Sequence, residues 1–317
     1  MRAIVLGDGQ IRVRDDVARP TLQCDEALIR VSLAGVCATD LEIVKGYAGF
    51  EGVLGHEFVG KVERAPDGAW EGQRVVGSIN LGCGDCAVCR TQGPEHCPER
   101  TVLGIHERDG AFAEYVALPL SNLHRVPDSV SDERAVFTEP LAAAARILQQ
   151  ISMESGARVG VVGPGRMGML IGQLLGSAGP RVTMLGRSHS SLQLAEEMNM
   201  ATALVDTVAD DSFDVVVEAT GNDAGLAHSL RLVRPLGTLV LKSTFHGKAQ
   251  VDLTKLVVGE ITVVGSRCGP FDKALRLLER DAVNVLALID AEYSLEEAPQ
   301  ALEHAARPGV RKVLLRP

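Results

Sequence analysis

The chain has 317 residues, of which 46% are hydrophobic, 23% charged and 3% aromatic, and its formal net charge at pH 7 is −9. This length makes two domains the first expectation. The negative charge and the lack of a basic stripe argue against a nucleic acid or an anionic membrane as partner, since such surfaces attract clustered lysine and arginine.

The chain starts with MRAIVLGDGQIRVRDD, which predicts two short strands joined by a Gly-Asp-Gly turn. This stretch lacks the apolar core of a secretory signal, and no apolar run in the chain has the length that crosses a membrane. We therefore expect a cytoplasmic protein. Thiols stay reduced in that compartment, so clustered cysteines favour a metal site over disulfide bonds.

Separate segments offer sulfur, nitrogen and oxygen ligands for a metal: Cys37 in GVCATD, His56 and Glu57 in GHEFVG, and Glu139 in EPLA. Such a mixed set is typical of a catalytic zinc that keeps one position for water or substrate. Taken singly, each residue also has a structural explanation. Cys37 could fill the core, His56 could lie in a turn, and Glu139 could interact with a helix dipole before Pro140.

Residues 82–98 form a lobe with the spacing C-x2-C-x2-C-x7-C, made by Cys83, Cys86, Cys89 and Cys97. Two-residue gaps let a tight loop turn successive thiolates toward one point. Four thiolates complete a tetrahedral shell, which favours a structural zinc. An iron–sulfur cluster is the competing interpretation, because the first gaps resemble a ferredoxin run. Reduced cysteines without a metal are a further alternative.

The second half of the chain begins with RVGVVG at 158–163, which predicts a strand that leads into a turn and an amphipathic helix. Gly163, Gly165 and Gly168 form G-x-G-x-x-G at this turn, a context that predicts a dinucleotide site. Pro164, Arg166 and Met167 lie between these glycines and belong to the same predicted site.

Further strands are predicted at RVTMLG, ALVD, FDVVVEATG, GTLVLKS and ITVVGS, with helices at SSLQLAEEMN and AGLAHSLRLVRP. This alternation predicts a parallel, doubly wound sheet. At the end of RVTMLG, where an NAD site usually carries an acid, Gly186 stands instead, followed by Arg187 and Ser188. A guanidinium and a hydroxyl without a nearby carboxylate suit a 2′-phosphate, so we predict NADP(H) over NAD(H). The alternative is that Arg187 only covers the adenine.

Taken in order, GVCATD, GHEFVG, the four-cysteine lobe, GAFAEYV, EPLA and the dinucleotide-binding half are similar to the zinc-dependent medium-chain alcohol and polyol dehydrogenases over nearly the whole chain. The resemblance implies a mixed α/β fold. Residues 1–140 and 269–317 would form a partly open, GroES-like β-barrel domain that holds the zinc sites. Residues 141–268 would form a Rossmann domain. Two helices and a final strand are expected after 268, and the active site is expected in the cleft between the domains.

The resemblance also implies roles for individual residues. Cys37 and His56 match the zinc ligands, and Glu57 matches an acid that either binds the metal or lies just behind it. Glu139 stands where alcohol dehydrogenases carry a cysteine and polyol dehydrogenases a glutamate.

Around these ligands, Thr39 matches the hydroxyl residue that bonds the substrate oxygen and begins the proton path. Asp40 matches the carboxylate that orients the ligand histidine. Glu42 departs from those relatives that carry a histidine at the outer end of the proton relay, so the resemblance leaves the exit of the proton open.

Other residues are implied at the nucleotide or the substrate, although each could equally serve as a cap or a packed loop residue. They are Glu218, Ala219, Thr220 and Gly221 after the fourth strand, Lys242, Ser243 and Thr244 after the fifth, Arg267 toward the pyrophosphate, and Tyr47, Phe50 and His106 as candidate pocket residues.

Together these observations predict a zinc-dependent oxidoreductase that transfers hydride between a secondary alcohol or polyol, or the matching carbonyl compound, and NADP(H). We expect two zinc ions per chain and a homodimer or homotetramer. Glu139 favours polyols, sugars or amino-alcohols over simple primary alcohols. The alternatives are a zinc-free quinone or enoyl reductase of the same superfamily, which usually lacks this ligand set, and a nucleotide-sensing regulator without catalysis.

Overall fold

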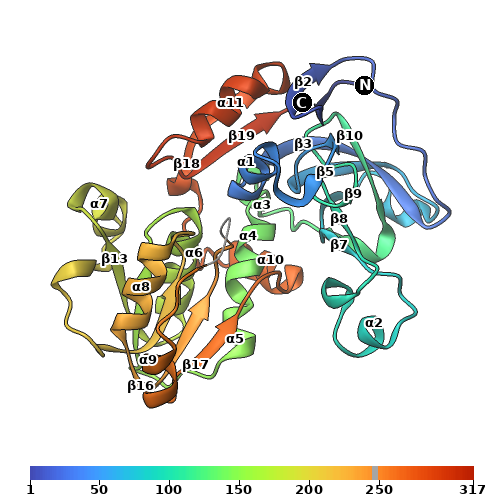
Figure 1. The fold of residues 1–317 in the computed structure, drawn as a ribbon. Helices are drawn as coiled ribbons and strands as arrows, with labels where there is room; N and C mark the ends of the chain where they lie inside the picture. Colours follow the sequence, from blue (N-terminus) through green and yellow to red (C-terminus); the bar gives the residue numbers. More distant parts are fainter. Residues whose placement is uncertain (245–248) are drawn as a thin grey trace. The chain divides into compact units, whose positions relative to one another are not determined.

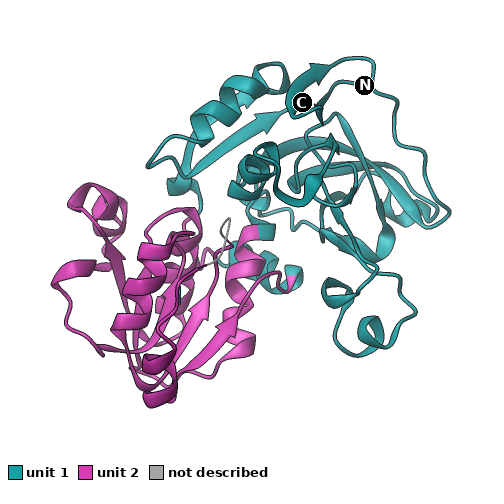
Figure 2. Cartoon of the chain, in the orientation of Figure 1, with its two compact units in different colours: residues 1–139, 271–280, 285–317 teal, residues 140–270, 281–284 magenta. Residues whose placement is uncertain are grey.

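The computed structural model describes residues 1–244 and 249–317 (Figure 1). The chain divides into two compact units (Figure 2): unit 1 comprises Met1–Glu139, Phe271–Arg280 and Val285–Pro317, and unit 2 comprises Pro140–Pro270 and Asp281–Asn284. The sequence predicted boundaries after residues 140 and 268. Within the described ranges, no helix is both long and apolar enough to cross a lipid bilayer.

Unit 1 is the GroES-like domain, and its main sheet has the strand order β11-β6-β5-β3-β19-β18, with β10 paired to β3. These strands are β3 (Glu26–Gly35), β5 (Glu57–Arg64), β6 (Arg74–Gly77), β10 (Tyr115–Pro119), β11 (Leu123–Arg125), β18 (Ile289–Ser294) and β19 (Lys312–Arg316). Smaller sheets contain β1 (Ala3–Gly7), β2 (Gln10–Arg14), β4 (Gly52–Val53), β7 (Asn80–Leu81), β8 (Thr101–Leu103) and β9 (Glu107–Arg108). The unit also holds the helices α1 (Ala38–Val44), α2 (Ala87–Thr91), α3 (Asp132–Ala135), α10 (Phe271–Glu279) and α11 (Ala298–Ala305).

The predicted hairpin at the start of the chain is present as β1 and β2, which pair antiparallel. Asp8 and Gly9 connect them, and both have a positive φ, 51° and 69°. A two-residue turn of this kind matches the twist of its flanking strands, and aspartate followed by glycine tolerates it.

The centre of the main sheet joins segments that are far apart in the sequence. β3 pairs antiparallel with β5, where Gly35 faces Glu57, and β19 pairs antiparallel with β3, where Leu314 faces Gly35. Most of β3 is buried, as its apolar sequence EALIRVSLAG suggests. The last strand in the chain therefore lies next to the segment that leads into Cys37.

The final segment contains one strand more than predicted. β18 pairs parallel with β19, and the register places Tyr293 beside Leu315. Its sequence, IDAEYS, alternates apolar and polar residues, with Ile289, Ala291 and Tyr293 on one face. This period-2 pattern is the signal that could have identified the strand.

Unit 2 is a Rossmann domain with the parallel strand order β14-β13-β12-β15-β16-β17. Its strands are β12 (Arg158–Val162), β13 (Arg181–Gly186), β14 (Ala201–Leu204), β15 (Phe213–Glu218), β16 (Val233–Leu241) and β17 (Thr262–Gly265). Its helices are α5 (Ile147–Gln150), α6 (Arg166–Ser177), α7 (His189–Glu197), α8 (Asp223–Leu232) and α9 (Leu253–Val258), and α4 (Thr138–Ala145) enters it from unit 1. The strand order reverses between β12 and β15, and ligands of such sheets bind beyond the carboxyl ends of the strands at this point.

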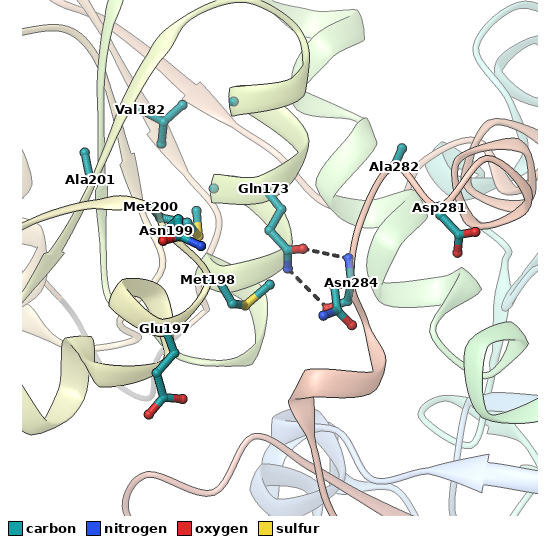
Figure 3. A pocket seen from close by; sticks show the side chains of 12 residues that line it. Gln173, Val182, Glu197, Met198, Asn199, Met200, Ala201, Asp281, Ala282 and Asn284 are labelled. Atoms are coloured by element: carbon teal, nitrogen blue, oxygen red, sulfur yellow. Dashed lines mark hydrogen bonds between the residues drawn. The ribbon is translucent and has the colours of Figure 1, made fainter.

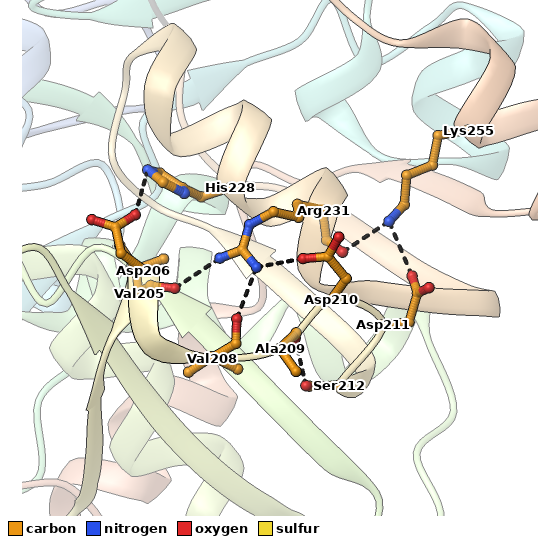
Figure 4. Close-up of polar contacts among 10 residues, drawn as sticks. All are labelled: Val205, Asp206, Val208, Ala209, Asp210, Asp211, Ser212, His228, Arg231 and Lys255. Carbon is orange, nitrogen blue, oxygen red and sulfur yellow. Dashed lines mark hydrogen bonds and ion pairs between the residues drawn. The ribbon is translucent and has the colours of Figure 1, made fainter.

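Polar contacts fasten the connection between β14 and β15 to the neighbouring helices (Figure 4). The Arg231 guanidinium, on α8, donates to the carbonyl oxygens of Val205 and Val208, 2.8 Å each, and to Asp210 at 2.6 Å. Lys255, on α9, donates to the Arg231 carbonyl at 2.8 Å and pairs with Asp211 at 3.0 Å. Each of these charged groups has a partner, and the contacts hold α8 and α9 against this connection.

A short segment after α10 returns to unit 2 because its backbone is bound to α6 (Figure 3). The Gln173 side chain accepts from the backbone N–H of Asn284 at 2.7 Å and donates to the Asn284 carbonyl at 3.5 Å. A cavity of about 600 Å³ lies beside this contact and is lined by residues such as Gly172, Met198 and Asp281. None of the predicted site residues lines it.

Candidate metal and nucleotide sites

Ligand atoms of Cys37, His56 and Glu57 lie within 4.8 Å of one another in unit 1. Cys37 precedes α1 as its N-cap, His56 ends the loop before β5, and Glu57 is the first residue of that strand. His56 and Glu57 are buried and Cys37 is half-buried. Sulfur, nitrogen and oxygen donors from two segments therefore meet at one point, which is the donor set that a transition-metal ion such as zinc takes.

Asp40, fully buried on α1, supports both Cys37 and His56. Its Oδ2 accepts from the backbone N–H of Cys37 at 2.8 Å. Its Oδ1 lies 3.1 Å from Nδ1 of His56, but the angles are not those of a hydrogen bond, and both buried atoms lack another partner. A small rotation of the imidazole would complete the carboxylate–histidine pair that usually supports a metal-bound histidine.

The electrostatics of this group favour a cation. Burial acts to lower the pKa of His56, but the charge of Asp40 and the hydrogen bonds to Asp40 and Cys37 raise it well above its ordinary value. The surroundings of His56 therefore favour positive charge at this point. A bound metal ion would supply that positive charge, so the residues present fit a metal cation.

The other residues predicted around this site lie at different distances from it. Thr39 is half-buried, and its Oγ1 lies 3.7 Å from Sγ of Cys37. Glu42 pairs with Lys45 at 2.8 Å on the exposed side of α1. Glu139 is half-buried at the start of α4 and is not within 4.8 Å of all three converging ligand atoms.

A cation that the sequence analysis did not identify lies against Glu57. Lys312, on β19, forms an ion pair with Oε2 of Glu57, and both side chains are almost completely buried. The Lys312 ammonium also donates to the Val36 carbonyl at 3.3 Å and lies 5.5 Å from the centre of the Phe137 ring. A Cβ on Gly35 would come within 2.5 Å of the same Glu57 oxygen, so a glycine is needed opposite this carboxylate.

The four cysteines of the lobe converge on a second point. The sulfur of Cys97 lies 3.7 Å from that of Cys83 and 3.9 Å from that of Cys86, and the sulfurs of Cys83 and Cys89 are 4.0 Å apart. Four thiolates at zinc–sulfur distances of about 2.3 Å would be about 3.8 Å apart, so the lobe has the dimensions of a single tetrahedral ion. The backbone N–H of Cys83 lowers the pKa of Cys97 to about 7, whereas burial raises the pKa of Cys89 to about 12. Four thiolates at this point therefore need a cation between them.

The glycine-rich turn in unit 2 brings three backbone segments into contact. Gly163 has a φ of 102°, and a Cβ there would lie 2.8 Å from the Ala219 carbonyl. A Cβ on Gly168 would lie 1.9 Å from the Gly163 carbonyl. Gly165 is the N-cap of α6, and the N-terminus of a twelve-residue helix of this kind is a common place for an anion to bind. Pro164, Arg166 and Met167 are half-buried around it.

The segment after β15 is held by the buried carboxylate of Glu218. Its Oε1 accepts from the backbone N–H of Thr220 at 2.6 Å, from the Thr220 hydroxyl at 2.5 Å and from the backbone N–H of Gly221 at 3.1 Å. Ala219 is tied to β12 by a bond from its N–H to the Val162 carbonyl, 2.9 Å. These contacts fix residues 219–221 beside the glycine-rich turn.

At the end of β13, Gly186 is buried and Arg187 and Ser188 are exposed. A Cβ on Gly186 would lie 2.6 Å from Oγ of Ser191, so a larger residue here would have to displace the neighbouring side chains. Ser188 is the N-cap of α7, and its hydroxyl lies 3.0 Å from that of Ser190.

The remaining predicted residues differ in accessibility. The Lys242 ammonium, expected near the nicotinamide, donates to the carbonyls of Ala143 and Arg267 and to the Ser266 hydroxyl, so it ties α4 to the segment after β17. Ser243 and Thr244 follow it at the edge of the described residues. Phe50 is buried, whereas Tyr47 and His106 are exposed.

Comparison with known proteins gives matches to two family models. Residues 23–128 match the alcohol dehydrogenase GroES-like domain, and residues 167–280 match the zinc-binding dehydrogenase domain. Sorbitol dehydrogenase of Halalkalibacterium halodurans is 32% identical, with 100% of this chain and 99% of that protein covered. D-arabinitol dehydrogenase 1 of Uromyces fabae is 29% identical over 94% of this chain and 92% of its own length. Among solved structures, a zinc-binding dehydrogenase from Sinorhizobium meliloti 1021 bound to NADP superposes with a TM-score of 0.91 at 30% identity, and covers 100% of this chain and 99% of that one.

Proposed function

The chain belongs to the zinc-dependent medium-chain alcohol and polyol dehydrogenases, and on that premise we propose that it transfers hydride between a secondary alcohol or polyol, or the matching ketone or aldehyde, and NADP(H). The observation that carries the proposal is the convergence of Cys37, His56 and Glu57 within 4.8 Å. A zinc-free reductase of the superfamily has no need of this donor set. A regulator that only senses nucleotides has no need of this donor set either.

In the proposed reaction, Cys37 and His56 hold the catalytic zinc, and Asp40 keeps the imidazole turned toward it. Zinc, when bound, supplies Lewis-acid stabilisation of the charge that develops on the substrate oxygen, an effect worth several kcal/mol. The Thr39 hydroxyl beside Cys37 accepts the alcohol proton and passes it on. Glu42 is already paired with Lys45, so it can receive that proton only when the pair opens.

We propose that the dinucleotide binds at the glycine-rich turn, with the pyrophosphate at the N-terminus of α6. Arg187 and Ser188 are exposed, and a glycine stands before them in place of a carboxylate, which supports binding of a 2′-phosphate and hence NADP(H). Residues 219–221, Ser243, Thr244 and Arg267 are proposed to line the nicotinamide nucleotide. For Lys242, the backbone is proposed to make this contact, because its side chain is engaged elsewhere.

The polyol class of substrate is supported by Glu139 and by the similarity to enzymes named for sorbitol and arabinitol. The spacing of the sulfurs in the lobe supports a second, structural zinc, so we propose two zinc ions per chain. A cytoplasmic location stays a prediction.

We further propose that the protein is at least a homodimer, formed through an edge patch that we define as Leu236, Leu253, Val257, Val258 and Val263. These apolar side chains are between 43% and 79% exposed. They come from β16, α9 and β17, and β17 is the last strand in the sheet order, paired with β16 among the described residues. A two-fold axis beside β17 would pair this strand with its copy and cover the patch.

The proposal is tested with zinc-loaded protein and a panel of sugar alcohols, diols and amino-alcohols, while reduction of NADP+ and NAD+ is followed separately. We expect turnover of at least one polyol, a higher kcat/KM with NADP+, and two zinc ions per chain by elemental analysis. Cys37→Ser is expected to lower kcat by about 10³-fold, the loss of several kcal/mol of charge stabilisation. NADPH binding should persist.

Cys24→Ser is the control, because Cys24 is exposed and belongs to neither metal group. Full turnover by Cys37→Ser would refute zinc-assisted chemistry. Equal or better use of NAD+ would refute the assignment of Arg187 and Ser188.

A further inference from the structure

Three polar side chains of unit 1, none of them used in the proposed reaction, are joined by consecutive hydrogen bonds. Oγ of Ser78 lies 2.8 Å from Nε2 of His124, and Nδ1 of the same ring lies 2.7 Å from Oδ1 of Asp272. When Asp272 accepts from the Nδ1–H group, Nε2 is left to accept the hydroxyl proton of Ser78. A hydroxyl, an imidazole and a carboxylate joined in this order form the arrangement that activates a serine as a nucleophile.

Three separate elements bring these side chains together. Ser78 follows β6, His124 lies on β11, and Asp272 is the second residue of α10. β11 pairs antiparallel with β6, and the backbone N–H of Ser78 extends this pairing by donating to the Asn122 carbonyl at 2.8 Å. The Asn122 amide donates in turn to the carbonyls of Ser78 and Asn80, at 2.8 and 3.0 Å. The backbone that carries the serine is therefore fixed on both sides.

The imidazole of His124 is held by packing as well as by Asp272. It stacks on the ring of Phe271, with the ring centres 5.1 Å apart and the planes inclined by 25°. The side chain of His124 is 19% exposed, whereas that of Asp272 is 70% exposed. An exposed carboxylate is screened by solvent, so it orients the ring less strongly than a buried one would. Ser78 itself is half-buried, which leaves access for a small reagent only.

We propose that Ser78 is the nucleophile of a second reactive site, which hydrolyses small activated esters and needs neither metal nor nucleotide. Oγ of Ser78 bonds to the ester carbonyl carbon while Nε2 of His124 takes its proton. The bond to the leaving oxygen then breaks, that oxygen takes the proton from His124, and the acyl group stays on Ser78. Water that His124 deprotonates releases the acyl group as a carboxylic acid and restores the hydroxyl.

The residue after the nucleophile commonly supplies a backbone N–H to the oxyanion in hydrolases of this kind. Ile79 stands in this position. Asp272 is a positioning residue in the proposed site, because it touches only the ring of His124. Its removal should therefore slow the reaction less than removal of the base, since stacking on Phe271 still holds the imidazole.

The test treats the full-length protein with diisopropyl fluorophosphate, which reacts with activated serines, and locates the adduct by peptide mass spectrometry. We expect one adduct per chain, on Ser78, and hydrolysis of p-nitrophenyl acetate that falls as this adduct forms. His124→Gln should slow the labelling at least about 100-fold, the usual contribution of a general base. Asp272→Asn should slow it by a smaller factor, and Ser78→Ala should remove the adduct.

Ser121→Ala is the matched control, because Ser121 is an exposed serine on the neighbouring turn whose hydroxyl contacts Asn122. This variant should label and hydrolyse the ester as the wild type does. Cys37→Ser should also keep full labelling, which separates Ser78 from any ester hydrolysis at the metal site. The labelling therefore does not depend on whether the protein oxidises alcohols.

Two results overturn the proposal: a wild-type protein without an adduct on Ser78, or equal labelling rates in the wild type and His124→Gln. Either would leave the hydrogen bonds of His124 with the structural task of fastening α10 to β11. If His124→Gln does not fold, the rate in Asp272→Asn takes its place, and labelling as fast as in the wild type overturns the proposal.

Discussion

Gly168 is the third glycine of the nucleotide turn, and the space around it determines how closely α6 approaches β12. A Cβ at this position would lie 1.9 Å from the Gly163 carbonyl, a backbone atom that cannot move aside. We expect Gly168→Ala to weaken NADPH binding at least 10-fold and to lower the melting temperature, measured by fluorescence titration and by calorimetry.

Variants of two other glycines separate the effect on nucleotide binding from the effect on stability. A Cβ on Gly165 or on Gly176 meets no atom within 4 Å. Gly165→Ala should retain the melting temperature but weaken nucleotide binding, because Gly165 lies where the backbone must approach a pyrophosphate. Gly176→Ala, inside α6, should stabilise the protein by up to about 1 kcal/mol and leave binding unchanged. Unaltered binding in Gly168→Ala would contradict the assignment of the turn.

At the scale of single residues, the sequence predicts those site residues that lie in a recognisable local motif. Cys37, His56 and the four lobe cysteines are identified because their neighbours in the chain form recognisable patterns. Lys312 is not, since it stands in the apolar stretch KVLLR and acquires its role only when β19 pairs with β3. Gly35 is missed for the same reason, because its need for space arises from Glu57 on another strand.

Among the elements, β15 is tied to both of its neighbours by Asp214. Its carboxylate accepts from Nε of Arg234, on β16, at 2.6 Å and from the backbone N–H of Arg158, on β12, at 2.7 Å. The bond from Arg234, followed by that from Arg158, lowers the pKa of Asp214 from 3.8 to about 2. The side chain is one-quarter exposed, so solvent screens part of the interaction.

This shift has a defined pH window. A carboxylate whose pKa is lower in the folded state stabilises the fold at pH above about 4 and loses that effect as pH falls toward about 2. We expect Asp214→Asn to lower the free energy of unfolding by about 1–2 kcal/mol at pH 7, measured in urea, and the difference from wild type to shrink below pH 4.

Asp16→Asn is the comparison, because Asp16 pairs with Arg14 on the exposed surface, where solvent screens the pair, and it should change the free energy of unfolding much less. A difference between Asp214→Asn and wild type that stays constant from pH 7 to pH 3 would show that the carboxylate charge is not the cause.

The strands of unit 2 were largely predictable because buried parallel strands are continuous apolar runs between helices. The ends of these strands were less predictable. The predicted third strand, ALVD, lies at 203–206, whereas β14 covers Ala201–Leu204, because Val205 already starts a 3₁₀ turn. The contacts of Arg231 with the carbonyls of Val205 and Val208 help to hold this turn, and they form across more than twenty residues of sequence.

At the scale of the whole molecule, the edge patch predicts that copies of the chain associate into a dimer or tetramer. Val257 and Val258 are 75% and 79% exposed on α9, and β17 ends the sheet order within the described residues. We expect the wild-type protein to be a dimer or tetramer by light scattering, and Val257→Asp/Val258→Asp to dissociate at least 100-fold more readily, because an aspartate would be buried without a partner.

Leu286→Asp is the control for a general effect of added charge, since Leu286 is 50% exposed and belongs to unit 1, outside the patch. A monomeric wild-type protein, or a double variant that keeps the wild-type mass, would remove this surface as the interface.

The order of the motifs along the chain was enough to predict both domains. It could not predict that residues 281–284 return to unit 2, because this depends on two hydrogen bonds with Gln173.

The return of β19 to β3 affects how the protein is made. A ribosome that adds about 5–20 residues per second needs roughly 13–50 s to extend the nascent chain by the 255 residues from Glu57 to Lys312. During that time Cys37, His56 and Glu57 have all been synthesised, but the lysine that neutralises the glutamate has not. Metal captured during translation would therefore meet a more negative site than metal delivered after release.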